Sequence, residues 1–240
     1  GNFCVPSGTN NLIYTIVYAS AVVIVVAFLL AFVSQVLEGP SKANERIDKK
    51  KQILSALNIR GLDNEQVEAE YAKVVSADCI IDSKGSVVED GTDKDQNGFT
   101  VDSKDITPDN LPLYICQING ATKYVIPLSG KGLWGSIWGY IALNEDGNTV
   151  FGAYFGHQSE TAGLGARISD LDFQEQFKGK KVMSDDGSIA LKVVKKGQVK
   201  EPNFECDGIS GATLTMNGVT AMFTECIAQY HAFLASKQQP

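Results

Sequence analysis

An uncharged, apolar run near the start of the chain most limits how it can fold. Leu12 to Val36 is almost wholly apolar, and no charged residue precedes Glu38. At about 1.5 Å per residue, a helix over this run would cross a hydrocarbon core of roughly 30 Å. Tyr14 and Tyr18 suit one membrane interface. The run lacks the basic start and the short apolar core of a cleaved signal peptide, so it predicts a retained transmembrane helix.

The basic residues around this run predict an orientation. Lys42, Arg46 and the Lys49–Lys51 cluster follow the apolar run, whereas no Lys or Arg precedes it. Basic residues favour the cytoplasmic side of a membrane. By this rule alone, the large domain that follows the helix would lie in the cytoplasm.

Composition limits the remaining classes of function. The chain of 240 residues can hold one core domain beside the anchor. Its net charge of −7 and the lack of a basic patch with interleaved aromatics argue against a nucleic-acid binder. The cysteines show no C-x-x-C spacing, so they indicate buried thiols, with one disulfide left open, and no metal site. These cysteines are Cys4, Cys79, Cys116, Cys206 and Cys226.

After the apolar run, the pattern predicts helices followed by strands. Two helices are expected at Ser41–Leu57 and Asn64–Val75, and a hairpin around Ser83-Lys-Gly85. Residues 89–110 are polar and rich in Asp, which is typical of a surface loop.

From Leu113 onward the pattern is that of antiparallel strands. Asn119-Gly120 and the turn at 145–148 each predict a hairpin, and Ile189–Val194 predicts a further strand. We therefore expect an α+β fold, an antiparallel-sheet domain preceded by a single transmembrane helix. The expected divisions are a tail and transmembrane helix at 1–37, a helical linker and hairpin region that packs on the soluble domain at 38–110, and the soluble domain at 111–240.

A turn of small residues, Asp207-Gly-Ile-Ser-Gly-Ala-Thr-Leu-Thr215, leads into a last helix expected from near Met216. The N-terminus of a helix offers unbonded N–H groups and favours phosphate, and two threonine hydroxyls lie in the same stretch. Two alternatives remain open at this level. The Ser and Thr residues could cap the helix. Ser210 could be a nucleophile, although Ala212 stands where a nucleophile elbow needs glycine.

A second glycine-rich segment is Gly130-Lys-Gly-Leu-Trp-Gly135. It spells G-x-G-x-x-G, but the residues from Ser136 alternate like a strand, whereas a dinucleotide site needs a helix there. The remaining alternatives are a tight turn between strands or a flat surface against which a ring can pack.

The small-residue turn resembles a flavin-attachment motif. Asp207, Ser210, Gly211, Ala212 and Thr213 match Asp-x-x-Ser/Thr-Gly-Ala-Thr, the motif of the FMN-binding domain family found in two redox-driven ion pumps. The resemblance implies that Thr213 carries FMN through a phosphoester bond, with Thr215 beside it.

Two further segments resemble the same family, in the same order along the chain. The first includes Lys131, Gly132, Leu133 and Trp134, and implies an apolar surface for the flavin ring with a lysine that neutralises negative charge. The second includes Glu160, Thr161, Gly163 and Leu164, where Ala162 replaces the usual proline. There the resemblance implies hydrogen bonds to the ring edges from Thr161. For Glu160 it leaves open whether the carboxylate orients the ribityl hydroxyls or holds the loop.

The resemblance points most closely to the C subunits of the Na⁺-translocating NADH:quinone oxidoreductase family, translocases that couple NADH oxidation and ubiquinone reduction to Na⁺ export. It implies an electron-relay flavoprotein with covalent FMN and no complete active site, catalytic residue or metal of its own. The implied partners are the other subunits of a six-subunit complex in the bacterial inner membrane, a flavin transferase and membrane lipid. The implied location of the soluble domain is periplasmic, against the charge rule. The alternatives are the G subunit of the related Rnf complex, and an assembly module without flavin.

Overall fold

The computed structural model describes residues 8–238, apart from the side chains of residues 8–11, 37 and 40. Its contacts divide the chain into two compact units, Gly1–Asp48 and Lys49–Pro240. The first helix, α1 (Gly8–Ala56), has residues in both units. The expected helices at the apolar run and at Ser41–Leu57 are thus parts of one helix. Leu12–Val36 has a mean hydropathy of 2.9 and is long and apolar enough to cross a membrane.

A six-stranded antiparallel sheet organises the second unit, with strand order β2-β1-β3-β4-β5-β6. Three predicted hairpins are confirmed: β3–β4, β5–β6 and, around Ser83–Gly85, β1–β2. At the first, Asn119 and Gly120 both adopt a positive φ, as a two-residue hairpin turn requires. The strands are β1 (Val75–Ile81), β2 (Val87–Glu89), β3 (Leu111–Ile118), β4 (Ala121–Lys131), β5 (Ser136–Asn144) and β6 (Val150–His157).

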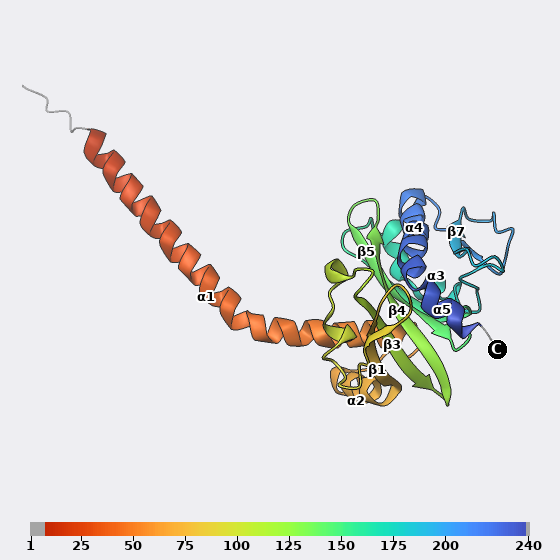
Figure 1. Ribbon diagram of the computed structural model, residues 1–240. Coiled ribbons are helices and arrows are strands. Elements are labelled where there is room, and N and C mark those ends of the chain that lie inside the picture. Colours follow the sequence, from red (N-terminus) through yellow and green to blue (C-terminus); the bar gives the residue numbers. More distant parts are fainter. Residues whose placement is uncertain (1–7, 239–240) are drawn as a thin grey trace, which may run out of the picture. The chain divides into compact units, whose positions relative to one another are not determined.

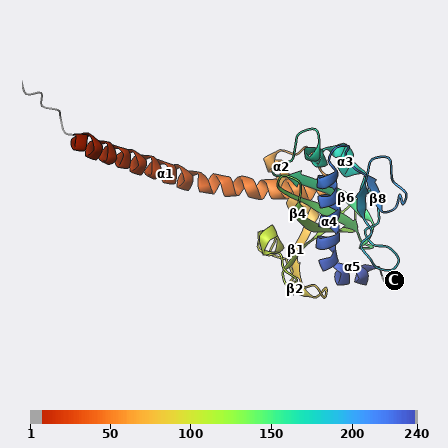
Figure 2. The same cartoon turned by 90° about the horizontal axis from the view of Figure 1, so that it is seen from above.

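One face of the sheet is covered by the C-terminal helices α4 (Thr213–Gln229) and α5 (His231–Lys237). Figures 1 and 2 show α4 lying across the strands. Ile126 and Leu128 of β4 share a buried cluster with Met222 and Phe223 of α4. This cluster is the main hydrophobic core, and it fixes the position of α4 on the sheet.

The opposite face is covered by the end of α1 and by α2 (Asn64–Val74). Asp63 caps α2 through a reciprocal hydrogen-bond pair with Gln66, which ends the preceding turn and starts the helix. At the end of α1, Asn58 donates to the Phe151 carbonyl and Gln52 accepts from Trp138. These bonds join α1 to β5 and β6 within the second unit.

The segment at 89–110, expected to be a surface loop, is partly buried. Phe99 in η1 (Gly98–Thr100) is only 3% exposed and packs edge-on against Tyr71 at 5.8 Å. Asp78 in β1 is fully buried and accepts from the backbone N–H groups of Asn97 and Phe99. Because this segment is mostly polar, its composition did not indicate that Phe99 would be buried. A second short helix, η2 (Ser103–Asp105), follows it.

The remaining elements lie between β6 and α4. They are η3 (Gly165–Ser169), α3 (Leu171–Glu175), β7 (Lys192–Val194) and β8 (Glu205–Asp207). β7 and β8 pair in parallel and form a separate two-stranded sheet, which the sequence pattern did not predict. Cys79, Cys116, Cys206 and Cys226 are free thiols, and Cys4 lies outside the described residues.

Candidate functional site

The turn between β8 and α4 exposes Thr213 at the start of a helix. The helix begins at Thr213, three residues before the expected start, and its N-cap residue is Ala212, with no side chain capping it. The capping alternative for this turn is therefore wrong in the structure. The first-turn N–H groups lack a side-chain acceptor, and Thr213 is exposed beside them. This arrangement suits a phosphate carried on the Thr213 hydroxyl.

Two glycines shape this turn for different reasons. Gly211 has φ +81°, and a side chain there would also meet the Leu164 methyl group at 3.0 Å. Gly208 donates its N–H to the Val194 carbonyl at 2.7 Å, and a Cβ there would lie 2.6 Å from that oxygen. Gly211 therefore permits the backbone conformation, and Gly208 permits the close approach of β7.

Glu160 connects its own loop, at 160–165, to the loop at 130–135 and to the first turn of α4. One carboxylate oxygen accepts from the Trp134 N–H at 2.8 Å, and the other accepts from the Thr215 hydroxyl at 2.5 Å. The Glu160 side chain is thus engaged in holding the loops. Thr215 is buried, so its hydroxyl does not share a surface with that of Thr213 as expected. Through Glu160, the loops at 130–135 and 160–165 meet the first turn of α4.

The environment of Glu160 keeps it charged. Burial by itself would raise the pKa of its carboxyl group, but the hydrogen bonds from the Thr215 hydroxyl and from the N–H groups of Trp134 and Gly135 outweigh burial and lower the pKa below its ordinary value of 4.5. Nearby, the His157 ring accepts from the Glu160 N–H at 3.3 Å. Glu160 is therefore a structural anion inside the candidate site.

The Gly-x-Gly segment is a tight turn that joins β4 to β5. Gly132 donates to the Gly135 carbonyl at 2.8 Å, and a strand follows, which confirms that the segment is not a dinucleotide site. The helix packs closely on this turn, because a Cβ at Gly218 would lie 2.3 Å from the Lys131 carbonyl. Lys131 itself is exposed.

The loop at 158–165 turns back on itself at Thr161. The Thr161 carbonyl accepts from the N–H groups of Leu164 and Ala166, both at 3.1 Å, and Gly163 has φ +76°. Thr161, Gly163 and Leu164 are all exposed. The loop therefore presents Leu164 next to Gly211 of the attachment turn, without needing the proline that Ala162 replaces.

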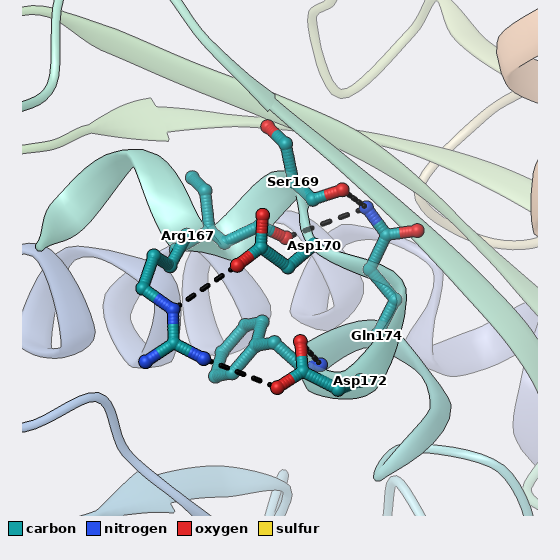
Figure 3. A network of polar contacts seen from close by, with 7 residues as sticks. Arg167, Ser169, Asp170, Asp172 and Gln174 are labelled. Atoms are coloured by element: carbon teal, nitrogen blue, oxygen red, sulfur yellow. Dashed lines mark hydrogen bonds and ion pairs between the residues drawn. The ribbon is translucent and has the colours of Figure 1, made fainter. Parts of the chain in front are cut away.

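Behind this loop, a polar network fixes η3 and α3. Gln174, which is 1% exposed, donates to the carbonyls of Phe155, Ile168 and Ser169. Arg167 bridges Asp170 and Asp172 at 3.0 and 3.1 Å (Figure 3). This network connects η3, which begins at Gly165 of the loop, to β6 of the main sheet.

Large apolar side chains are exposed around the attachment turn. Trp134 is 66% exposed, Leu133 46%, Leu164 40% and Leu214 59%. Their segments are brought together by the Glu160 bonds and by the contact of Leu164 with Gly211. Exposed apolar residues in one region mark a site for an apolar or aromatic group. This surface suits the face of a flavin ring.

A cavity of about 290 Å³ has Thr213 in its wall. Ser210, Gly211 and Thr213, which the sequence predicts as flavin-binding residues, lie in its wall, together with Lys195 and Lys196, which were not predicted. Those lysines belong to no motif, and only the pairing of β7 with β8 brings them here. The wall comprises Val193, Val194, Lys195, Lys196, Gly208, Ile209, Ser210, Gly211, Thr213, Met216 and Asn217.

Asp207, the first residue of the motif, is not in the cavity wall. Its carboxylate accepts from the Gly197 N–H at 2.7 Å, and its backbone bonds with the Gln176 side chain at 3.0 and 3.3 Å. The structure thus brings together residues of all three predicted segments, whereas Asp207 and Glu160 bond to the protein itself.

Comparisons with known proteins agree with this geometry. Residues 132–228 match the family model of the FMN-binding domain. The C subunit of the Na⁺-translocating NADH-quinone reductase of Haemophilus ducreyi is 31% identical, over 83% of each chain. The C subunit of the same enzyme from Vibrio anguillarum is 30% identical over 90% of this chain and 91% of its own.

Solved structures show the same fold. The crystal structure of the corresponding C subunit from Parabacteroides distasonis is 36% identical, covers 82% of this chain and 96% of its own, and has a TM-score of 0.75. NqrC of Shewanella oneidensis is 27% identical, covers 82% of this chain and 99% of its own, and has a TM-score of 0.68. The chain therefore belongs to the family of the C subunits of the Na⁺-translocating NADH-quinone reductases.

Proposed function

We propose that this protein is an electron-relay subunit that carries FMN covalently on Thr213 and works in a complex that couples NADH oxidation and ubiquinone reduction to Na⁺ export. The observation that carries the proposal is the exposed Thr213 hydroxyl at an uncapped helix start, with three glycine-rich segments gathered around it. When bound, FMN would supply one-electron chemistry, and the protein would supply attachment and position.

The residues around Thr213 divide the task of holding such a group. The N–H groups of the first turn of α4 would donate to the phosphate, because no side chain caps them. Leu133, Trp134 and Leu164 would cover the ring, and the exposed Thr161 would donate to a ring edge. Lys131 would place a positive charge beside this surface. Ser210, Gly211 and Ala212 would let the phosphate approach the backbone closely.

Attachment requires an activated flavin phosphate and a transferase that presents it. A bond forms between the Thr213 oxygen and the phosphorus, the hydroxyl loses its proton, and the bond from phosphorus to its leaving group breaks. The product has the mass of the chain plus FMN less water. The donor and the transferase are partners that this proposal requires from outside the chain.

The proposed setting is a bacterial inner membrane, with residues 1–37 as tail and single-pass anchor, 38–110 as a linking region on the soluble domain, and 111–240 as the flavin-binding domain in the periplasm. The complex would have six subunits, this one included. The other subunits would supply the NADH site and the Na⁺ path. The relay alone would then have no complete active site.

Intact mass and in-gel flavin fluorescence test the attachment. The full chain, produced with its transferase, is compared with Thr213→Val, which removes only the hydroxyl, and with Thr224→Val, an exposed threonine elsewhere on α4. We expect covalent FMN in the wild type and Thr224→Val, and none in Thr213→Val. Covalent FMN on Thr213→Val would refute the site, and a wild type without flavin would favour an assembly module.

A further inference from the structure

We propose that Asp207 is a positioning residue, which holds the Lys195–Gln198 turn so that Lys195 and Lys196 bind the phosphate on Thr213. The inference rests on the proposed attachment of FMN at Thr213. It assigns Asp207 a role through the lysine turn rather than through direct contact with the flavin.

The bonds of Asp207 point to this turn. Its side chain accepts from the Gly197 N–H at 2.7 Å, and it is the register partner of Val194, the residue just before the turn. The next residue, Gly208, donates to the Val194 carbonyl at 2.7 Å. Two hydrogen bonds, one on each side of the lysine pair, therefore fasten the turn to the start of the motif.

The turn itself is tight and depends on this support. Gln198 donates to the Lys195 carbonyl at 2.9 Å, and Gly197 has φ +77°. The N–H of Gly197, at the third position of the turn, is the group that Asp207 accepts from. Without that acceptor the N–H would turn to water, and the two lysines would lose their fixed relation to α4.

The charges at the cavity favour an anion. Lys195 and Lys196 are exposed, and neither forms an ion pair with any residue that the structure describes. They share the wall of the 290 Å³ cavity with Thr213 and Asn217. A phosphodiester on Thr213 would place a negative charge at this wall, and lysine ammonium groups attract phosphate.

The alternative is that the transferase recognises the negative charge of Asp207 directly. The two explanations differ for Asp207→Asn, because an amide oxygen can still accept from the Gly197 N–H although the charge is gone. Asp207→Ala removes both the acceptor and the charge.

The first measurement is the rate of covalent flavin gain, followed by intact mass, in the full chain with limiting transferase. Lys195→Gln/Lys196→Gln and Asp207→Ala should each slow the gain by roughly three-fold to ten-fold, the effect of losing one or two exposed charge pairs. Asp207→Asn should stay within about two-fold of the wild type. Equal loss in Asp207→Asn and Asp207→Ala would overturn the positioning role. Lys178→Gln/Lys181→Gln, at two exposed lysines outside the cavity, is the matched control and should show no change.

The second measurement is the ³¹P resonance of the loaded protein, which does not depend on the transferase. We expect Lys195→Gln/Lys196→Gln and Asp207→Ala to move the phosphodiester resonance in the same direction, and the control pair to leave it in place. An unchanged resonance together with an unchanged rate in the lysine variant would overturn the inference. Covalent FMN on Thr213→Val would instead defeat the proposed attachment, so the two failures are distinct.

Discussion

At the scale of single residues, the Glu160–Thr215 hydrogen bond holds the candidate site together. Thr215→Val keeps the shape of the side chain but leaves one buried carboxylate oxygen of Glu160 without its donor. We expect a loss of about 1–3 kcal/mol in the free energy of unfolding. Urea unfolding of the full chain in detergent measures it. Thr224→Val is the control, because the Thr224 hydroxyl bonds only within its own exposed helix turn. Equal stability of the two variants would contradict this role.

The same bond predicts a dependence on pH. The folded pKa of Glu160 lies below its ordinary value of 4.5, with burial opposed and outweighed by the Thr215 and backbone hydrogen bonds. A lowered carboxyl pKa gives stability that is present above pH 4.5 and is lost as the pH falls through the folded pKa. The difference in unfolding free energy between wild type and Thr215→Val should therefore be full at pH 7 and should narrow as the pH falls below 4.5. A difference in unfolding free energy that grows as the pH falls would contradict this prediction.

At this scale, residues could be selected from the sequence where a fixed motif singles them out, and could not be selected where their contacts depend on the fold. Thr213 and the Gly-Leu-Trp turn could be selected because their spacing matches a known pattern. The partner of Glu160 could not, because Thr215 is far away in sequence and its hydroxyl could equally have been a cap. Lys195 and Lys196 carry no pattern, and only a parallel strand pair places them at the cavity.

At the scale of elements, local turn signals carried most of the prediction. The hairpins β1–β2, β3–β4 and β5–β6 of the main sheet were located from their turn residues, and α2 from its periodicity, since these depend on neighbours in sequence. The start of α4 was placed late because no side chain caps it, and a left-handed glycine precedes it instead. The burial of Phe99 was missed because a polar segment surrounds it.

The packing of α4 on the β4–β5 turn gives a prediction for Gly218. Alanine favours a helix over glycine by about 1 kcal/mol, yet a Cβ at this position would lie 2.3 Å from the Lys131 carbonyl. The backbone cannot move aside without shifting the Gly-x-Gly turn, so Gly218→Ala should destabilise the protein by about 1–3 kcal/mol. Thermal unfolding measures this change.

A matched control for that substitution lies in α1. Gly39 is also helical, and an added Cβ there would meet nothing within 4 Å. Gly39→Ala should leave the unfolding of the second unit unchanged. If Gly218→Ala unfolds at the same temperature as Gly39→Ala, the close packing of α4 on the turn would be contradicted.

At the scale of the whole molecule, the anchor and the flavin-binding unit should be separable. The sheet, its covering helices and all three glycine-rich segments lie within Lys49–Pro240, while the apolar run lies within Gly1–Asp48. A chain of residues 41–240 should therefore be monodisperse without detergent and show the same sheet content by circular dichroism. Co-produced with the transferase, it should still gain covalent FMN. Aggregation of this chain would mean that the unit depends on the anchor.

The charge rule and the family resemblance predict opposite orientations of that unit in the membrane. Lys42, Arg46 and the lysines at 49–51 follow the span and favour a cytoplasmic domain, whereas the proposed function needs a periplasmic one. Cys4 precedes the apolar run in the sequence, so a single membrane span would place it on the side opposite to the domain. This makes it a built-in reporter, because Cys79, Cys116, Cys206 and Cys226 are buried or half-buried.

A membrane-impermeant maleimide applied to intact spheroplasts resolves the conflict. One variant combines Lys178→Cys, at an exposed position, with Cys4→Ser. It is compared with the chain that keeps Cys4 and lacks the introduced cysteine. With the domain in the periplasm, the introduced cysteine should be labelled and Cys4 should react only after lysis. The reverse pattern would place Thr213 in the cytoplasm, where the positive-inside rule puts it, and would then require a cytoplasmic transferase for any flavin found there.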